Sequence, residues 1–297
     1  MNSLLASLTD SPQAGFQFDQ VLHHAGATLQ HGPNNDRVYL MSLGQADPHE
    51  VLCEVHHLAD QHGYGKIFAK LPHTQAEPFL NQGYRVEARI PDFYPDADAV
   101  FLGHYPEPER AQVAEPEALH TTLQQATLDL KPDGRSRHDP AIRLMHEADV
   151  DKMAALYRQV FPSYPFPITD RDFLLETMAD NVAYFGVEKD GALLALASAE
   201  QCHQSGTVEM TDFATAPAAR GQGWAQRLLA QMELAMEAQG HRVAYTIARA
   251  VSVGMNRTFA RRQYQMAGRL VNNTQISGQI ESMNVWYKPL RPASNGG

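Results

Sequence analysis

The chain has few of the features that mark secreted, metal-binding or membrane proteins. Its 297 residues include only two cysteines, Cys53 and Cys202, which lie far apart and lack the paired spacing of a metal site. We therefore expect reduced thiols in a cytoplasmic protein. No apolar run approaches the ~20 residues that a membrane-spanning helix needs. The first residues also lack the basic start and long apolar core of a signal peptide.

Positive charge is scarce as well. The formal net charge is −10 and no run of lysine or arginine occurs, so we do not expect nucleic acid as a partner. An acidic protein attracts cations over long range, and an amine substrate would suit it. The histidines include the adjacent pairs His23-His24 and His56-His57. Adjacent residues do not share a helical face, so we interpret them as surface histidines and expect no metal site.

A polar segment divides the chain. Residues 106–139 are rich in proline, glutamate and other polar residues, with one short helix expected near 117–128. We predict a domain boundary near residue 135. The predicted parts are an N-terminal α/β domain, residues 1–135, and a second domain, residues 136–297.

The second domain alternates helix and strand patterns. Apolar spacing predicts helices at 149–161, 170–178, 223–239 and 252–263, and strands at 141–145, 182–188, 192–201, 207–215, 242–248, 268–273 and 281–287. Asp190-Gly191 supplies the positive φ angles of a hairpin turn. The predicted fold class is α/β (α+β), with one mixed sheet flanked by helices.

The N-terminal part has a similar order of elements. Helices are predicted at 48–61 and 74–82, and strands at 63–72, 85–90 and 98–105. Each end of the chain thus runs helix, strand, helix, strand, strand. We hypothesise that residues 1–105 contain a degenerate copy of the C-terminal half-fold.

The stretch from Val208 to Ala235 carries the clearest chemical signal. A strand ends at Thr215, and a loop with Arg220, Gly221 and Gly223 opens the next helix. A helix N-terminus offers unpaired N–H groups and partial positive charge, and small residues let a phosphate approach them. The P-loop pattern is absent, and the third glycine of the dinucleotide pattern is missing. A glycine-rich helix start without a ligand remains the alternative.

This loop resembles the acyl-CoA signature of the GNAT acetyltransferase superfamily, R-x-x-G-x-G/A. Arg220, Gly223 and Ala225 match its marked positions, and the order of elements from 141 to 287 resembles that fold. A narrower resemblance extends over nearly the whole chain. The segments KIFAK, EARIPDFY, DAVFLGHY, TDFATAP, RGQGWA, GMNRTFA, LVNNTQISG and IESMNVWYK look like the β-lysine N-acetyltransferase family.

The resemblance implies acetyl transfer from acetyl-CoA, as co-substrate and without a metal, to the terminal amine of β-lysine. The product, N-acetyl-β-lysine, would serve as a compatible solute in osmoadaptation. The residues it implies for holding acetyl-CoA are Phe213, Ala214, Thr215, Arg220, Gly221, Gln222, Gly223, Trp224, Ala225, Asn256 and Phe259.

Catalysis needs a proton acceptor for the ammonium and a donor for the leaving thiolate. Glu209 and Asp212, on the strand that ends at the cofactor loop, are candidate bases, and water-mediated deprotonation would need neither. Phe259 stands where many GNAT enzymes have a tyrosine acid, so Tyr264 is the candidate acid, and a buried tyrosine at the start of a strand is the alternative for that residue. The candidate substrate contacts are Tyr164, Arg249, Asn273, Glu281 and Asn284.

Two other functions remain open at this point. The acceptor could be another small amine, such as lysine, ornithine or a polyamine. The substitution at Phe259 also leaves open a non-catalytic acyl-CoA-binding module. A homodimer is compatible with the sequence, and neither nucleic acid nor a membrane is expected as a partner.

Overall fold

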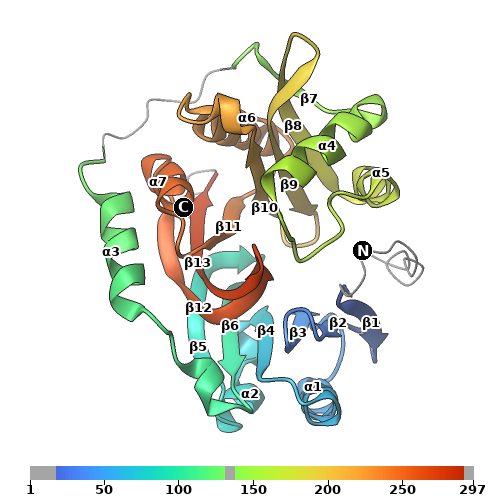
Figure 1. The fold of residues 1–297 in the computed structure, drawn as a ribbon. Coiled ribbons are helices and arrows are strands. Elements are labelled where there is room, and N and C mark those ends of the chain that lie inside the picture. The colour runs from blue at the N-terminus through green and yellow to red at the C-terminus, as the bar shows by residue number, and fades with distance from the viewer. Residues whose placement is uncertain (1–17, 131–137, 291–297) are drawn as a thin grey trace, which may run out of the picture. The chain divides into compact units, whose positions relative to one another are not determined.

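A computed structural model describes residues 18–130 and 138–290 (Figure 1). Strands are flanked by helices throughout, and this confirms the predicted α/β class. Within those residues no helix is long and apolar enough to cross a membrane.

Packing divides the chain into two compact units. We call Met1–Pro116 with Ala267–Met283 the N-terminal unit, and Glu117–Met266 with Asn284–Gly297 the C-terminal unit. The predicted boundary near residue 135 lies outside the described residues, and the division by packing falls earlier. The closing hairpin was expected in the second domain, but residues Ala267–Met283, which are most of its first strand, its turn and the start of its second strand, pack with the N-terminal unit. The order of residues along the chain does not reveal that the hairpin packs with the other unit.

The N-terminal unit is built on a sheet with the strand order β1-β2-β3-β4-β6-β5, followed by β12. β3 and β4 are parallel, because α1 crosses between them, and the neighbouring pairs are antiparallel. The elements are β1 (Gln20–His24), β2 (Ala27–Gly32), β3 (Arg37–Ser42), α1 (Pro48–His62), β4 (Lys66–Pro72), the 3₁₀ turn η2 (His73–Gln75), α2 (Glu77–Asn81), β5 (Arg85–Tyr94), β6 (Ala97–His104) and the 3₁₀ turn η3 (Pro108–Ala111). We did not predict β1 to β3, whose short sequences mix polar and apolar residues.

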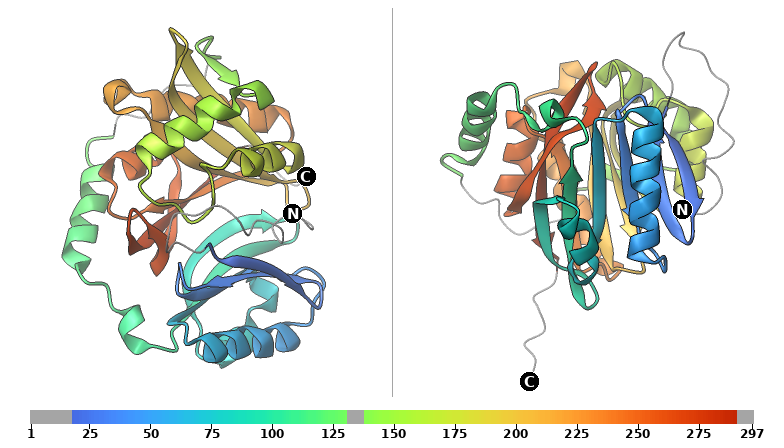
Figure 2. Two further views of the ribbon diagram at one scale, coloured as in Figure 1. Left: turned by 45° about the vertical axis from the view of Figure 1, so that its right-hand side comes forward. Right: turned by 90° about the horizontal axis from the view of Figure 1, so that it is seen from below.

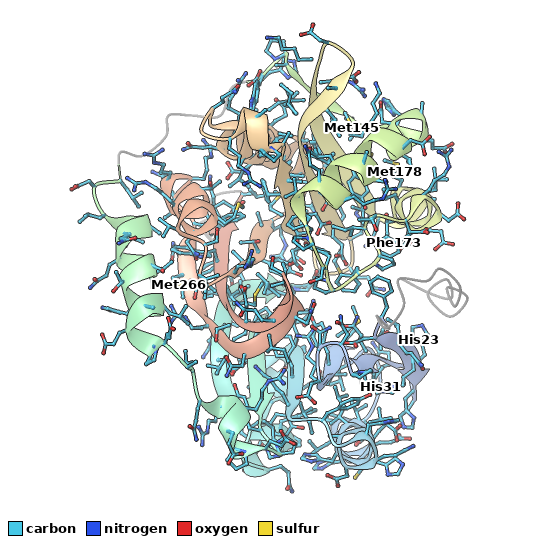
Figure 3. The ribbon with its side chains drawn as sticks, in the orientation of Figure 1. His23, His31, Met145, Phe173, Met178 and Met266 are labelled. Atoms are coloured by element: carbon cyan, nitrogen blue, oxygen red, sulfur yellow. The ribbon has the colours of Figure 1, made fainter. Side chains whose placement is uncertain are left out.

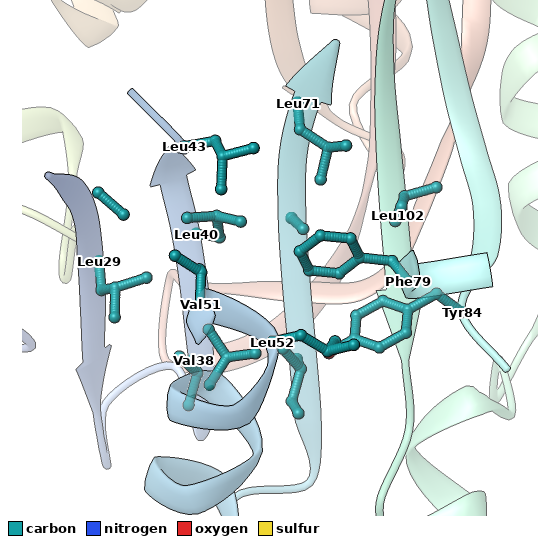
Figure 4. Close-up of a cluster of buried hydrophobic side chains, with 14 of the residues drawn as sticks. Leu29, Val38, Leu40, Leu43, Val51, Leu52, Leu71, Phe79, Tyr84 and Leu102 are labelled. Carbon is teal, nitrogen blue, oxygen red and sulfur yellow. The ribbon is translucent and has the colours of Figure 1, made fainter. Parts of the chain in front are cut away.

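Helix α1 covers one face of these strands (Figure 2). Asp47 caps its first turn by accepting from the N–H groups of His49 and Glu50, and Gly63, at φ 69°, ends it. Val51 and Leu52 point from α1 into a cluster with strand residues such as Leu40 and Leu71 (Figure 4). Burial of these side chains holds the helix on the sheet, since each fully buried aliphatic side chain contributes about 1.5–3 kcal/mol.

Buried and half-buried histidines make the stability of the N-terminal unit depend on pH. Burial lowers the pKa of His31 on β2 (Figure 3), of His56 on α1 and of His104 on β6 below the ordinary 6.5. The unfolded chain therefore binds these protons more readily than the folded chain does. Stability is complete above pH 6.5 and is lost as the pH falls from 6.5 through the folded pKa values.

We expect the urea midpoint of unfolding to fall between pH 7.5 and pH 5.5, and His56→Gln to reduce that loss. His57→Gln is the matched control, because His57 is the exposed neighbour of His56 on the same helix. Equal acid sensitivity of the two variants and the original chain would contradict this interpretation.

The C-terminal unit has the strand order β13-β11-β10-β9-β8-β7, and α4 and α6 lie on opposite faces of it (Figure 1). Its elements are α3 (Pro116–Thr127), β7 (Ile142–Leu144), the 3₁₀ turn η4 (Glu147–Asp149), α4 (Val150–Val160), α5 (Arg171–Asp180), β8 (Val182–Lys189), β9 (Ala192–Cys202), β10 (Thr207–Thr215), the 3₁₀ turn η5 (Pro217–Ala219), α6 (Trp224–Ala238), β11 (Val243–Arg249), α7 (Val253–Arg261) and the second half of β13 (Gln279–Pro289). The strand before β13, β12 (Gln265–Ile276), belongs to the N-terminal unit from Ala267 on. Each predicted helix and strand is present, with ends that differ by a few residues.

The two units share one order of connection. In each, three antiparallel strands lead through a helix to a fourth strand parallel to the third, and a second helix and a hairpin follow. The return strand of each hairpin lies beside the fourth strand, β6 beside β4 and β13 beside β11. This likeness supports the hypothesis of a degenerate repeat.

Candidate active site

The centre of the C-terminal unit is a divergence of two parallel strands. β10 and β11 pair only where Thr207–Glu209 lies beside Val243–Tyr245. Among the described residues no further pairing of these strands follows, although β10 continues to Thr215 and β11 to Arg249. Peptide groups on the last part of β10 therefore have no partner strand on this side. Such peptide groups can pair with an extended ligand, and contact of Phe213, Ala214 and Thr215 with acetyl-CoA stays a prediction.

A bulge lies at the same point of β10. The register against β9 passes from Thr211 opposite Ser198 to Ala214 opposite Leu196, so β10 holds one extra residue. Asp212 sits in this bulge at φ 52°, in the left-handed region that few residues other than glycine adopt. A strained backbone at a bulge reorients a side chain, and here the side chain is a carboxylate.

The Asp212 carboxylate is held by hydroxyl groups. Tyr164, in the loop between α4 and α5, donates to Oδ1 at 2.5 Å, and Ser198 on β9 donates to Oδ2 at 2.5 Å. Burial raises the pKa of Asp212 above its ordinary value, and these hydrogen bonds oppose the rise. Asp212 and Tyr164 are half-buried residues. The result is a carboxylate held by two hydroxyl groups, neither of which carries a positive charge.

The loop after β10 offers an anion site at the start of α6. Gly221 and Gly223 have φ angles of 78° and 76°, and a Cβ at either would meet no atom within 4 Å. Gly223 occupies the N-cap position and contributes no side-chain cap, and the first turn holds no acidic residue. Arg220 is exposed beside them. Uncapped N–H groups, open glycines and a nearby guanidinium fit a pyrophosphate.

The corresponding helix of the N-terminal unit, α1, has a capped N-terminus. Helix α1 also follows the third strand of its unit, but Asp47 accepts from its first-turn N–H groups and Glu50 adds a second negative charge. A carboxylate that satisfies those donors repels a phosphate. Of these two helix N-termini, only that of α6 is therefore suited to a phosphate.

Two predicted cofactor residues bind each other. The Trp224 Nε1–H donates to Oε1 of Gln222 at 3.2 Å, and the Arg227 guanidinium stacks 4.0 Å from the Trp224 ring centre. Arg227 is in turn paired with Asp139. This contact fixes the indole over the first turn of α6. Contact of Gln222 and Trp224 with acetyl-CoA stays a prediction.

Phe213, Phe259 and Tyr264 form a chain of aromatic rings. Phe213 meets Phe259 edge to face at 5.7 Å, and Phe259 meets Tyr264 at 5.1 Å. The position of the expected tyrosine thus lies against the diverging end of β10, but it carries no hydroxyl group. Burial raises the pKa of Tyr264 well above its ordinary value, with Glu233 nearby. Tyr264 therefore stays protonated, as an acid must, and its role stays a prediction.

Asn256 is a structural hub. Its Nδ2 donates to the backbone carbonyls of Arg249 and Ser252, and its Oδ1 accepts from Asn284 Nδ2 and Trp286 Nε1. Asn256 and Asn284 are fully buried. These bonds join the start of α7 to β13. They give both side chains a structural task, and the predicted ligand contacts of the two residues stay predictions.

We expect Asn256→Ala to lower the free energy of unfolding by about 2–4 kcal/mol, because two buried donors lose their acceptor. Chemical denaturation measures this loss. The dissociation constant of acetyl-CoA should change less than about threefold in protein that remains folded. A large loss of acetyl-CoA affinity without a loss of stability would instead make Asn256 a cofactor contact.

The predicted substrate residues are divided between the units. Tyr164 lies with Asp212, whereas Arg249 ends β11 and Asn284 belongs to the Asn256 hub. Asn273 and Glu281 pack within the N-terminal unit, where both are buried.

Sequence reasoning missed two residues around Asp212. Ser198 interrupts the apolar strand LALASAE, and a buried polar residue in such a strand was the available signal. Tyr157 on α4 is fully buried, its hydroxyl lacks a hydrogen-bond partner, and Asp212 contributes to the rise in its pKa. No pattern in the sequence distinguishes Tyr157 from an ordinary apolar position of the helix.

Comparisons with known proteins agree with this geometry. The profile of the Acetyltransferase (GNAT) family matches residues 150–268. The β-lysine N(6)-acetyltransferase of Methanococcus maripaludis is 35% identical over 91% of this chain and 98% of its own length. The enzyme of the same name from Methanosarcina mazei is 31% identical over 78% of this chain and 94% of its own length. A solved N-acetyltransferase from Staphylococcus aureus Mu50 is 21% identical over 50% of this chain and 98% of its own, with a TM-score of 0.45.

The diverging strands, the bulge and the uncapped helix N-terminus define an N-acetyltransferase of the GNAT class that uses acetyl-CoA as its acyl donor. Within that class, the chain belongs to the family of the β-lysine N(6)-acetyltransferases.

Proposed function

We propose that the protein transfers an acetyl group from acetyl-CoA to the terminal amine of β-lysine. The observation that carries the substrate is similarity to the Methanococcus maripaludis enzyme over 91% of this chain. The ammonium first loses one proton to a base, and the free amine nitrogen then bonds to the acetyl carbon. The bond from that carbon to sulfur breaks, and the second proton lost by the nitrogen ends on the coenzyme A thiol, so that the products are the amide, free coenzyme A and one proton. β-Lysine carries two ammonium groups and one carboxylate, so acetylation leaves a neutral zwitterion.

The cofactor loop would hold the donor. Arg220 and the N–H groups from Gly221 to Ala225 suit the pyrophosphate, and β10 from Phe213 to Thr215 suits the extended pantetheine arm. Acetyl-CoA supplies an activated thioester to this site. The open space at Gly221 and Gly223 supports this assignment.

Asp212 is the residue we propose as ammonium ligand and proton acceptor. A lysine-like amine has a pKa near 10.4 and arrives protonated. Tyr164 and Ser198 orient the carboxylate, and its raised pKa brings it closer to that of a useful base. Glu209, earlier on β10, lies within the paired part of the strand and is the second candidate.

The N-terminal unit is, in our proposal, a degenerate copy of the C-terminal half-fold that no longer binds acyl-CoA. Its connection order matches, and Asp47 fills the helix N-terminus where a phosphate would bind. We further propose that the enzyme acts in the cytoplasm and that its neutral product is a compatible solute for osmoadaptation. The homodimer stays a prediction, which sedimentation of the full chain can test.

The test is thiol release from acetyl-CoA with β-lysine, α-lysine, ornithine and spermidine offered separately. We expect release with β-lysine to exceed release with any other amine. Preference for another amine would discard the substrate and keep the reaction. Tight acetyl-CoA binding without release by any amine would make the protein a binding module.

A further inference from the structure

A series of side-chain contacts leads from the residues before β7 to the cofactor loop (residues 220–225). Both carboxylate oxygens of Asp139 accept from the Arg227 guanidinium, from Nε at 2.6 Å and from Nη2 at 3.0 Å. The guanidinium stacks 4.0 Å from the ring centre of Trp224, whose Nε1–H donates to Gln222 at 3.2 Å. All four residues belong to the C-terminal unit. Asp139 is therefore linked to the cofactor loop through two intervening side chains.

Asp139 is itself fixed to the helix and the sheet of this unit. Its N–H donates to Oε1 of Gln231 at 3.0 Å, so Asp139 binds α6 at two residues that lie one helical turn apart. Its carbonyl accepts the N–H of Ile142 at 3.0 Å, and Ile142 pairs with Val187 of β8. The carboxylate thus holds Arg227 from a residue that is bonded to both α6 and β7.

The cofactor loop contains backbone that such contacts can restrain. Gly221 and Gly223 both have φ in the left-handed region, and a Cβ at either would meet no atom within 4 Å. Glycines in open space can adopt many conformations, and a flexible loop loses that freedom when it binds a ligand. Gln222, between them, binds Trp224 on one side and the carbonyl of Ala218 at 3.5 Å on the other. Contacts that fix Trp224 therefore reduce the entropy lost on binding.

The ion pair between Asp139 and Arg227 is better suited to fixing geometry than to stabilising the fold. The Arg227 side chain is 42% exposed, and exposed ion pairs add little to the free energy of unfolding. Two parallel N–H···O bonds do fix the plane of the guanidinium, and the indole stacked on that plane is fixed with it. The carboxylate also neutralises the charge of Arg227. Its effect on a bound phosphate is therefore exerted through the loop and not through direct attraction.

We propose that Asp139 and Arg227 are positioning residues for the acyl donor. They hold Trp224, and through Gln222 the cofactor loop, in the conformation that binds the nucleotide end of acetyl-CoA. This inference rests on the proposed acetyl-CoA site at the start of α6, and it does not depend on which amine is the acceptor. Because only the nucleotide end carries the pyrophosphate, a donor that lacks this end should not need the two residues.

The test compares acetyl-CoA with S-acetylpantetheine, which has the same thioester but no nucleotide. Asp139→Asn keeps the shape of the side chain and removes the charge that orients Arg227. We expect the dissociation constant of acetyl-CoA, measured by isothermal titration, to rise about tenfold, and kcat/KM for acetyl-CoA to fall by a similar factor. With β-lysine as acceptor, kcat/KM for S-acetylpantetheine should stay within about twofold.

Asp151→Asn is the matched control, because Asp151 forms an exposed ion pair with Arg171 in the same unit. It removes the same charge, and acetyl-CoA affinity should change less than about twofold. Fluorescence reports on the loop directly. The two tryptophans of the chain are Trp224, which is half-buried, and Trp286, which is 3% exposed. Iodide should therefore quench the fluorescence of Asp139→Asn more strongly than that of the original protein or the control.

Arg227→Gln should weaken acetyl-CoA binding as much as Asp139→Asn does, and the double variant should bind no more weakly than either single variant. Arg227→Gln, with the same expected difference between the two donors, replaces Asp139→Asn if that variant does not fold.

Three results would overturn the proposal. Unchanged acetyl-CoA affinity in Asp139→Asn would show that the loop does not need the ion pair. Tighter binding would show that the released Arg227 attracts the phosphate directly. An equal loss of kcat/KM with both donors would indicate a general packing defect. If the original protein binds acetyl-CoA but acetylates no amine, the proposed function fails, and the titrations with acetyl-CoA still decide the positioning role.

Discussion

Replacement of Gly223 by aspartate is expected to weaken acetyl-CoA binding at least about 100-fold without unfolding α6. Gly223 is the N-cap of α6 and has no side chain to accept from the first-turn N–H groups. An aspartate there would place a negative charge at the helix N-terminus, where Asp47 stands on α1, and would repel a phosphate. Aspartate tolerates positive φ better than most residues, so backbone strain is modest. Isothermal titration with acetyl-CoA measures the effect.

The matched control is Gly191→Asp. Gly191 lies in the hairpin after β8 at φ 79°, and a Cβ there also meets no atom within 4 Å. The Gly191→Asp substitution imposes the same backbone strain and adds the same negative charge, but at a position away from any helix N-terminus. Equal loss of acetyl-CoA affinity in the two variants would contradict the assignment of the cofactor site to the start of α6.

Asp212→Asn is expected to reduce kcat by about 10²- to 10⁴-fold, the range typical for loss of a general base. The affinity for acetyl-CoA should be retained, because the anion site depends on Gly221 and Gly223 instead. An amide cannot take the ammonium proton and no longer attracts its charge. Steady-state kinetics with β-lysine measure the change, and Glu209→Gln tests the second candidate. A larger loss of kcat in Glu209→Gln than in Asp212→Asn would identify Glu209 as the proton acceptor instead of Asp212.

The pH profile separates catalysis from packing. Activity should fall with decreasing pH as Asp212 becomes protonated, at a pH above the ordinary carboxyl pKa because burial raises it. Tyr164 stabilises the charged carboxylate by donating to it, so Tyr164→Phe should move this loss of activity to higher pH. A variant that only loosened packing would lower the rate at every pH without such a shift.

The same carboxylate should affect stability in the opposite direction. Its folded pKa lies above the unfolded value, so the folded chain binds this proton more tightly and the charged form lowers stability at neutral pH. Asp212→Asn should therefore unfold at a higher temperature at pH 7, and this gain should disappear as the pH falls through the folded pKa. Greater stability with lower activity is typical of residues that serve catalysis.

Local sequence patterns determined most of the secondary structure of the second domain. Ser252 and Asp170 cap helices at the predicted starts, and the turn at Asp190-Gly191 forms as its dipeptide requires. These features depend on residues close together in the chain, where propensity and hydrogen bonding act directly. For the same reason the sequence of the loop from Arg220 to Ala225 was enough to predict an anion site there.

The sequence alone determined the family and the kind of reaction, and it predicts the donor loop, because each depends on short motifs of neighbouring residues. Only the tertiary structure decided that Asp212 meets Tyr164 and Ser198, since these residues come from a bulge, a loop and a neighbouring strand. It also decided that Asn273 packs against Arg37, 236 residues away in the chain. Burial and partnership of charged groups depend on chain segments that meet only after folding, so no local pattern encodes them.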